Sequence, residues 1–172
     1  NSLDYETATS YTLALNASDG VNTTTSELII TVDDVNEAPS LSNSLAASSF
    51  AENISTGITI ATASASDPES QTITYSLSGT GSGNFAVDSF GNITLAAGLD
   101  YETATSYSLT LSASDGVNTT TNTLAISISD INEAPSLSNS LAASSFAENV
   151  SAGTTIATAS ATDPESQTIT YS

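Results

Sequence analysis

The chain has 172 residues, of which 19 are Asp or Glu and none is Lys, Arg or His, so its formal net charge is −19. It therefore has no basic side chain with which to bind phosphates, so nucleic acid is excluded as a partner and anionic membrane surfaces are disfavoured. It also lacks cysteine, which excludes disulfides and thiolate metal sites.

The acidic residues recur along the chain with a period of 96 residues. In chain order, Leu3-Asp4-Tyr5-Glu6 returns as Leu99-Asp100-Tyr101-Glu102, and 16 of the 19 acidic residues lie in five motifs that repeat in this way. The other four pairs are Asp19-Gly20 with Asp115-Gly116, Asp34-Val35-Asn36-Glu37 with Asp130-Ile131-Asn132-Glu133, Glu52 with Glu148, and Asp67-Pro68-Glu69 with Asp163-Pro164-Glu165. Clustering of carboxylates at every repeat, without a basic partner, indicates that they hold a cation.

The period divides the chain into three predicted segments. Residues 1–35 are expected to be the C-terminal part of one repeat, residues 36–131 a complete repeat, and residues 132–172 the N-terminal part of the next. A unit of 96 residues suits a single small domain and exceeds the usual solenoid periods, so the repeats should follow one another in single file. No apolar run is long enough to cross a bilayer, and no membrane insertion is expected in this segment.

Residues 36–131 show alternating apolar and hydroxyl residues in short runs, with turn signals about every ten residues and no helical periodicity. This pattern predicts an all-β unit, and a two-sheet antiparallel sandwich buries one face of each strand. In chain order, the predicted core positions are Ile58 and Ile60 in residues 57–65, then Ile73, Tyr75 and Leu77, then Phe85 and Val87, then Ile93 and Leu95, then Tyr107, Leu109, Leu111 and Ala113, and finally Leu124, Ile126 and Ile128. Turns are predicted at Asp115-Gly116 and at Phe90-Gly91-Asn92.

In such a sandwich the acidic motifs are expected to converge at the junction between repeats. Asp100 and Glu102 lie in a loop, Asp130 ends the last strand, and the linker follows directly. Seven carboxylates would then share one junction, namely Glu52, Asp100, Glu102, Asp130, Glu133, Asp163 and Glu165. An all-oxygen set without His or Cys selects a hard cation, and the number and flexibility of the carboxylates favour Ca²⁺ over Mg²⁺.

The five motifs together resemble a known family. Ala-Glu-Asn, Asp-Pro-Glu, Leu-Asp-Tyr-Glu, Ala-Ser-Asp-Gly and Asp-x-Asn-Glu-Ala-Pro occur in the order and approximate spacing of the extracellular repeats of cadherins, as used in tandem in large bacterial surface proteins. The resemblance covers the entire chain. It implies Greek-key sandwiches in single file, with up to three Ca²⁺ at each junction.

The resemblance also implies which residues bind the ions. At the junction after the complete repeat they are Glu52, Asp100, Glu102, Asp130, Asn132 and Glu133, with Asp163 and Glu165 from the following repeat. At the preceding junction they are Asp4, Glu6, Asp34, Asn36 and Glu37, completed by Asp67, Glu69 and Asp115. Asp19 and Glu148 resemble ligands of junctions whose other halves lie outside this sequence.

The function expected from these features is that of a calcium-stiffened extracellular repeat, a spacer or filament module of a bacterial adhesin at the cell surface. Its partners would be the neighbouring repeats of the same chain. Two alternatives stay open: an adhesion module that binds other copies of itself or surface glycans, and a self-assembling fibre or sheath. Enzymatic activity is not expected, because the chain has no His or Lys to serve as a base and its carboxylate pairs repeat along the array.

Overall fold

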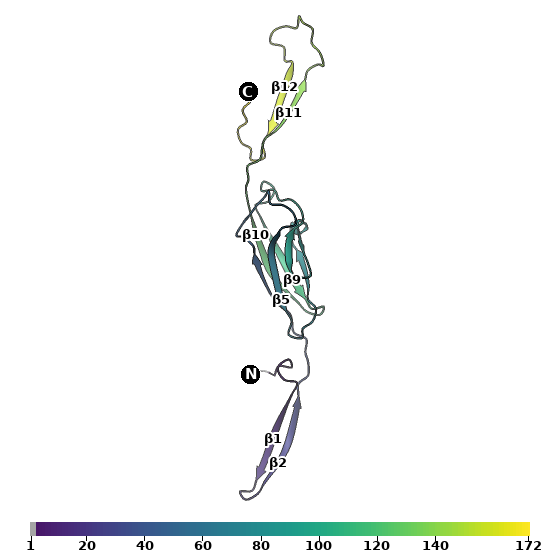
Figure 1. Ribbon diagram of the computed structural model, residues 1–172, viewed down its shortest axis with the longest axis vertical. Coiled ribbons are helices and arrows are strands. Elements are labelled where there is room, and N and C mark those ends of the chain that lie inside the picture. Colours follow the sequence, from purple (N-terminus) through teal and green to yellow (C-terminus); the bar gives the residue numbers. More distant parts are fainter. Residues whose placement is uncertain (1–2) are drawn as a thin grey trace.

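The computed structural model describes residues 3–172 and shows an elongated all-β chain. A hairpin, a sandwich and a second hairpin follow one another along the long axis (Figure 1). Within the described residues the one helical element is a single 3-10 turn, η1 (Ser82–Asn84), and no helix has the length and apolar character needed to span a membrane. The expected single-file, all-β architecture is therefore confirmed.

The central sandwich has two four-stranded sheets. The first contains, in spatial order, β4 (Phe50–Ala51), β10 (Thr119–Ser129), β9 (Ser106–Ser114) and β6 (Thr74–Ser78). The second contains β3 (Ser40–Leu45), β5 (Thr59–Ser66), β8 (Asn92–Leu95) and β7 (Phe85–Val87). All neighbouring strands are antiparallel except β4, which pairs in parallel with the end of β10 through Phe50↔Ile128. This short parallel pair brings the residue after β4, Glu52, beside the end of the last strand.

The core lies between the two sheets and is built from the alternating positions of the strands. The buried cluster consists of Phe50, Ile60, Ala61, Ala63, Phe85, Ile93, Leu95, Leu109, Leu111, Leu124, Ile126 and Ile128. Hydroxyl side chains take the outward positions, where they suit strands sterically and stay hydrated. The predicted core is confirmed with two exceptions, Ile58 and Ile73. Ile73 precedes β6, is only partly buried and does not pack against the cluster. Ile58 is wrong, because it precedes β5 just after the turn at Gly57, and 45% of its surface is exposed.

The flanking hairpins have strand sequences similar to those of the sandwich but lack the opposite sheet. β1 (Ser10–Ser18) pairs with β2 (Thr23–Thr31), and β11 (Ser136–Leu141) pairs with β12 (Ala157–Thr162), both antiparallel. Leu13 and Leu15 are 50% and 66% exposed, whereas Leu109 and Leu111, one repeat further on, are 1% and 0% exposed. Burial in this fold thus comes from sheet-on-sheet packing. The segment boundaries at residues 35/36 and 131/132 stay predictions.

Candidate metal sites at the junctions

Glu52 is the one buried charged residue among residues 3–172, with 6% of its surface exposed. It follows β4 and reaches two separate parts of the chain. Its Oε2 accepts a hydrogen bond from the backbone N–H of Tyr101 at 2.6 Å, and its Oε1 accepts one from the N–H of Ile131 at 2.7 Å. Because a carboxylate oxygen has two lone-pair directions, each oxygen retains one for a further partner. Glu52 therefore ties the Leu-Asp-Tyr-Glu loop to the end of β10.

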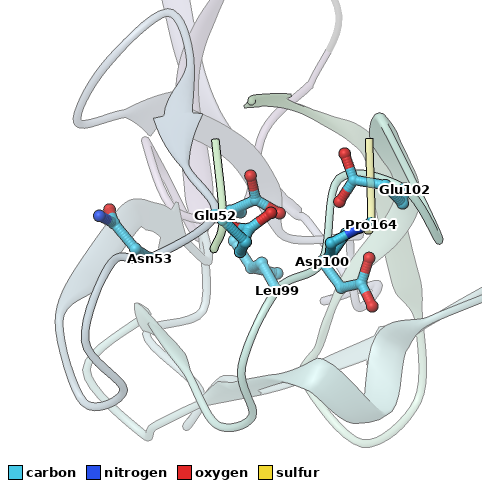
Figure 2. A pocket seen from close by; sticks show the side chains of 7 residues that line it. Glu52, Asn53, Leu99, Asp100, Glu102 and Pro164 are labelled. Atoms are coloured by element: carbon cyan, nitrogen blue, oxygen red, sulfur yellow. The ribbon is translucent and has the colours of Figure 1, made fainter. Parts of the chain in front are cut away.

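The Leu-Asp-Tyr-Glu loop divides its side chains between the core and the junction. Leu99 and Tyr101 pack against the buried cluster, while Asp100 and Glu102 are exposed. The loop is a tight turn in which Asp100 Oδ1 accepts the backbone N–H of Thr103 at 2.9 Å. Figure 2 shows Glu52, Asp100 and Glu102 lining one pocket together with Leu99 and with Pro164 of the following repeat.

Two groups of three carboxylates meet at this junction. Glu52, Asp100 and Glu102 each place an oxygen within 4.8 Å of the others, and Glu102, Asp130 and Glu165 do the same. Glu102 belongs to both groups. Glu165 comes from the segment beyond the linker, so the second group contains side chains from both sides of the junction.

One of these two groups recurs at the preceding junction, one period earlier. Glu6, Asp34 and Glu69 form a group within 4.8 Å, and these are the positions that correspond to Glu102, Asp130 and Glu165. Glu6 and Asp34 lie before the linker, whereas Glu69 lies beyond it. The recurrence of one constellation at two junctions follows from the repeat and not from a chance acidic surface.

Several carboxylate oxygens at both junctions are buried without a hydrogen-bond partner. They are Asp67 Oδ2, both oxygens of Glu69, Glu133 Oε2 and Glu165 Oε2. A buried acceptor left unpaired is costly, and the cost is greater for a charged group. The chain has no cationic side chain that could satisfy these atoms. A hard cation with oxygen ligands fits this donor set, as Ca²⁺ prefers carboxylates and tolerates irregular geometry.

Like charges raise the pKa of particular carboxyl groups here. Glu37 can hydrogen-bond to the Glu69 carboxylate only when Glu37 is protonated, and this bond, together with burial, raises the pKa of Glu37 to about 7 and lowers the pKa of Glu69. Glu133 has the same relation to Glu165, and its pKa is also raised to about 7. Without a cation, the raised pKa values therefore favour protonation of Glu37 and Glu133.

Glu102 responds to the same crowding of charge. A hydrogen bond with its own backbone lowers its pKa, but burial and the charges of Glu52, Asp130 and Glu165 outweigh this bond and raise the pKa overall. A positive charge beside Glu102, the residue common to both carboxylate groups, would offset this repulsion.

Other predicted ligands have different neighbours. Asp115 Oδ2 accepts a hydrogen bond from Asn36 Nδ2 at 2.9 Å, and Oδ1 accepts the N–H groups of Val117 and Asn118. Burial raises the pKa of Asp115, but these hydrogen bonds outweigh burial and lower it. Among residues 3–172, the three-carboxylate groups include none of Asp4, Asp19, Glu37, Asp67, Asp115, Glu133, Glu148 and Asp163.

These side chains outside the groups mostly accept local hydrogen bonds. Asp4 caps its turn through the N–H of Thr7 as Asp100 does, while Asp19 Oδ1 accepts the N–H groups of its own turn. Asp67 and Asp163 each accept a backbone N–H four residues ahead. Glu148 is exposed. Their assignment as ligands stays a prediction.

Sequence reasoning missed Gln71 and Gln167. The side-chain amide of Gln71 donates to Asn36 Oδ1, and that of Gln167 donates to Asn132 Oδ1. Both follow Asp-Pro-Glu-Ser and are separated by the 96-residue period, so the repeat carried a signal for them. A glutamine next to an acidic motif does not by itself predict a contact with the linker, because its hydrogen-bond partner is distant in sequence.

Comparison with known proteins agrees with the fold and the motifs. Residues 47–129 match the family model described as "Cadherin domain". "Protocadherin-like wing polarity protein stan" of Drosophila melanogaster is 33% identical over 180 aligned positions, which include 95% of this chain and 5% of that protein. "Protocadherin Fat 4" of Mus musculus is 32% identical over 181 positions, with 98% of this chain and 4% of that protein covered.

Solved structures resemble the whole chain. "Protocadherin Gamma B2 extracellular cadherin domains 3-6" has a TM-score of 0.67 and 25% identity, covering 95% of this chain and 42% of that one. The structure of the "Protocadherin GammaB4 extracellular domain" has a TM-score of 0.57 and 28% identity, covering 95% and 28%. The chain therefore spans a small fraction of the curated relatives and less than half of these solved chains.

Proposed function

Since residues 47–129 are a cadherin domain, we propose that this chain is a calcium-binding extracellular repeat whose junctions become stiff when the ion binds. Cadherin domains are adhesion modules that generally bind Ca²⁺ between repeats, and the relatives found are adhesion-related surface proteins. The observation that carries the proposal is the group of Glu102, Asp130 and Glu165, because it draws carboxylates from both sides of one linker.

The residues of each junction have distinct tasks. Glu52 and Asp100 would hold an ion on the side of the complete repeat, Glu102 would share two ions, and Glu165 would connect the following repeat. A bound Ca²⁺ supplies the positive charge and the coordination that the orphaned carboxylate oxygens lack. Asp4, Asn36, Glu37, Asp67, Asp115, Asn132, Glu133 and Asp163 belong to the proposed ligand set on the family resemblance, as do Asp19 and Glu148 at neighbouring junctions.

Calorimetric titration of the chain with Ca²⁺ tests the proposal. Extracellular calcium modules bind with dissociation constants of about 10⁻⁴ to 10⁻³ M, and we expect heats in this range. Glu102→Gln should remove more sites than Glu6→Gln, because Glu102 lies in two groups and Glu6 in one. Glu27→Gln is the matched control, since Glu27 is exposed on β2 outside the groups. Absence of binding up to about 10 mM, or equal titrations for Glu102→Gln and Glu27→Gln, would refute the proposal.

The cellular role proposed is that of a spacer or filament module of a bacterial adhesin. This part rests on the near identity of the repeats, as residues 36–53 and 132–149 are the same in sequence. The relatives named above are animal proteins and give no support to a bacterial source. Whether the protein binds another copy of itself is a separate question, which analytical ultracentrifugation in calcium answers.

A glycan-binding role has one observation in its favour. Phe90 is 83% exposed at the turn between β7 and β8, so the repeat does present one aromatic ring to solvent. A single ring is less than the apolar patch that a binding surface usually shows. Glycan-array binding that is lost in Phe90→Ser would support this second function.

A further inference from the structure

Asn36, the first polar residue of the linker, is bound on several sides by the repeat that follows it. Its Nδ2 donates to Asp115 Oδ2 at 2.9 Å, its Oδ1 accepts from the Gln71 amide, and its backbone carbonyl accepts from Asn118 Nδ2 at 3.1 Å. A side chain that uses both ends of its amide is fixed in position. The linker residue is therefore part of the hydrogen-bond network of the next domain.

The donors and acceptors in this network allow one arrangement. An ionised Asp115 only accepts hydrogen bonds, so the group of Asn36 that faces it must be the NH₂. The amide oxygen of Asn36 is then left for Gln71, which must present its own NH₂. A further contact holds the linker three residues after Asn36, where Thr120 Oγ1 donates to the Pro39 carbonyl at 2.6 Å.

The same amide pair recurs at the second linker. Gln167 donates to Asn132 Oδ1, and the backbone N–H of Glu133 donates to Glu165 Oε1 at 2.9 Å. The residues corresponding to Asp115 and Asn118 lie outside this sequence, so the second network is smaller. The Gln–Asn contact therefore forms without them.

The residues that precede each linker asparagine form hydrogen bonds with the repeat before the linker. The N–H of Val32 donates to the Thr9 carbonyl at 2.9 Å, and that of Ile131 donates to Glu52 Oε1. Among the described residues, no hydrogen bond joins 3–35 to 36–172, and none joins 3–131 to 132–172. The side chains that approach each other across the two junctions in the three-carboxylate groups are acidic, as in the group of Glu6, Asp34 and Glu69.

We propose that the pairs Asn36–Gln71 and Asn132–Gln167 are metal-independent latches that fix each linker to the repeat after it, and that the hinges are the Val35–Asn36 and Ile131–Asn132 peptides. Neutral amide hydrogen bonds persist where neighbouring carboxylates repel one another. Each linker and its following repeat then move as one body, and flexing is confined to one point per junction. The latch does not depend on calcium, and only the stiffening of the hinge rests on the proposed function.

Pairs of spin labels on the full chain, measured in chelator, test the latch. The chain has no cysteine, so introduced cysteines are labelled uniquely. Thr110 lies on the outward face of β9, and Ala38 and Ala134 occupy the same exposed position of the two linkers. We expect a narrow distance distribution for Thr110–Ala38 and a broad one for Thr110–Ala134. Equal widths, or the reverse order, would overturn the hinge assignment.

Substitutions identify the residue responsible. Gln71→Ala and the isosteric Gln71→Glu, which cannot donate, should both broaden the Thr110–Ala38 distribution. Gln167→Ala, the same change in the same motif at the other junction, should leave it unaltered. An unchanged width in both Gln71 variants would refute the latch at the first junction.

A third label pair, Ala134–Thr158, tests the second junction. Its distance distribution should be narrow, because both positions lie on the far side of the second hinge. A broad distribution there would refute the latch at the second junction.

Addition of Ca²⁺ separates this proposal from the proposed function. Narrowing of Thr110–Ala134 in calcium is expected from stiffening at the hinge. If that pair stays broad, the stiffening function fails while the latch stands. If Thr110–Ala38 is broad in chelator and becomes narrow only in calcium, the latch is wrong.

Discussion

Glu52 accepts the backbone N–H of Ile131 at 2.7 Å, so a carboxylate from near the start of the domain is hydrogen-bonded to the second residue after the last strand of the sandwich. Both oxygens of Glu52 are engaged in this way, the other by Tyr101. Glu52 therefore has a structural task as well as a place in a carboxylate group. The two tasks are separable, because only the first persists in chelator.

Glu52→Gln should destabilise the central sandwich even without calcium. The amide NH₂ would face a backbone N–H, and a buried donor left unpaired costs about 1–3 kcal/mol. Chemical denaturation in chelator measures this loss. Glu148→Gln, in the same Ala-Glu-Asn motif but exposed, is the matched control and should change stability little. Equal effects of the two substitutions would show that the buried hydrogen bonds of Glu52 are unimportant.

Asp100→Ala should weaken calcium binding and leave the β-sheet circular dichroism spectrum intact. Asp100 belongs to the group with Glu52 and Glu102, but it is exposed and outside the core. Asp4→Ala removes the corresponding turn cap at the other junction without disturbing a three-carboxylate group. Calorimetry should therefore show a loss of sites for Asp100→Ala that exceeds the loss for Asp4→Ala. Collapse of the spectrum at saturating calcium would assign Asp100 a structural role instead.

Leu111→Ala should cost about 2–5 kcal/mol of unfolding free energy, the usual range for a buried leucine. Leu111 is fully buried, whereas Leu15, its counterpart one repeat earlier, is 66% exposed. Leu15→Ala should therefore have a much smaller effect on the same chain. Thermal and denaturant unfolding of the two variants makes the comparison. Similar losses would mean that the β1–β2 face is covered in solution.

The raised pKa of Glu37 predicts a pH dependence in chelator. The pKa of Glu37 is raised from 4.5 to about 7, so the folded apo chain binds a proton that the unfolded chain has released. This stabilisation is present below about pH 4.5 and is lost as the pH rises through about 7. Glu37→Gln, which cannot ionise, should flatten this part of the profile of unfolding midpoint against pH.

The control for this profile is Glu27→Gln, because Glu27 is exposed on β2 and lies outside the carboxylate groups. On the proposed assignment of Glu37 as a ligand, calcium affinity should fall over the same interval as the pH decreases, because calcium would compete with the proton for this carboxylate. An unfolding midpoint that rises from pH 5 to pH 8 in the parent chain, and is unaffected by Glu37→Gln, would contradict the raised pKa of Glu37.

Much of the fold could be predicted because the repeat and the strand periodicity are both written in the sequence. Alternation at Leu109, Leu111, Leu124 and Ile126 identified the buried faces correctly. Ile58 was misassigned because the turn at Gly57 separates it from the strand, and periodicity alone does not show where a strand begins.

The site was less predictable from residue types. Motif positions indicated an acidic junction, but they did not distinguish Glu102, which lies in two carboxylate groups, from Asp115, which pairs with Asn36. Whether an acidic side chain lies next to other carboxylates or next to an amide depends on the three-dimensional path of the linker. The Gln71 contact was missed for the same reason, because its partner lies 35 residues away in sequence.

Small-angle X-ray scattering of the chain, recorded in millimolar calcium and in chelator, tests the central claim most directly. If calcium joins carboxylates across the junctions, the calcium data should fit one extended single-file shape like that of Figure 1. The chelator data should require an ensemble bent at the two hinges, with a broader distribution of maximum dimensions. Superimposable curves in the two conditions would contradict calcium-dependent stiffening, even if calorimetry showed that the ions bind.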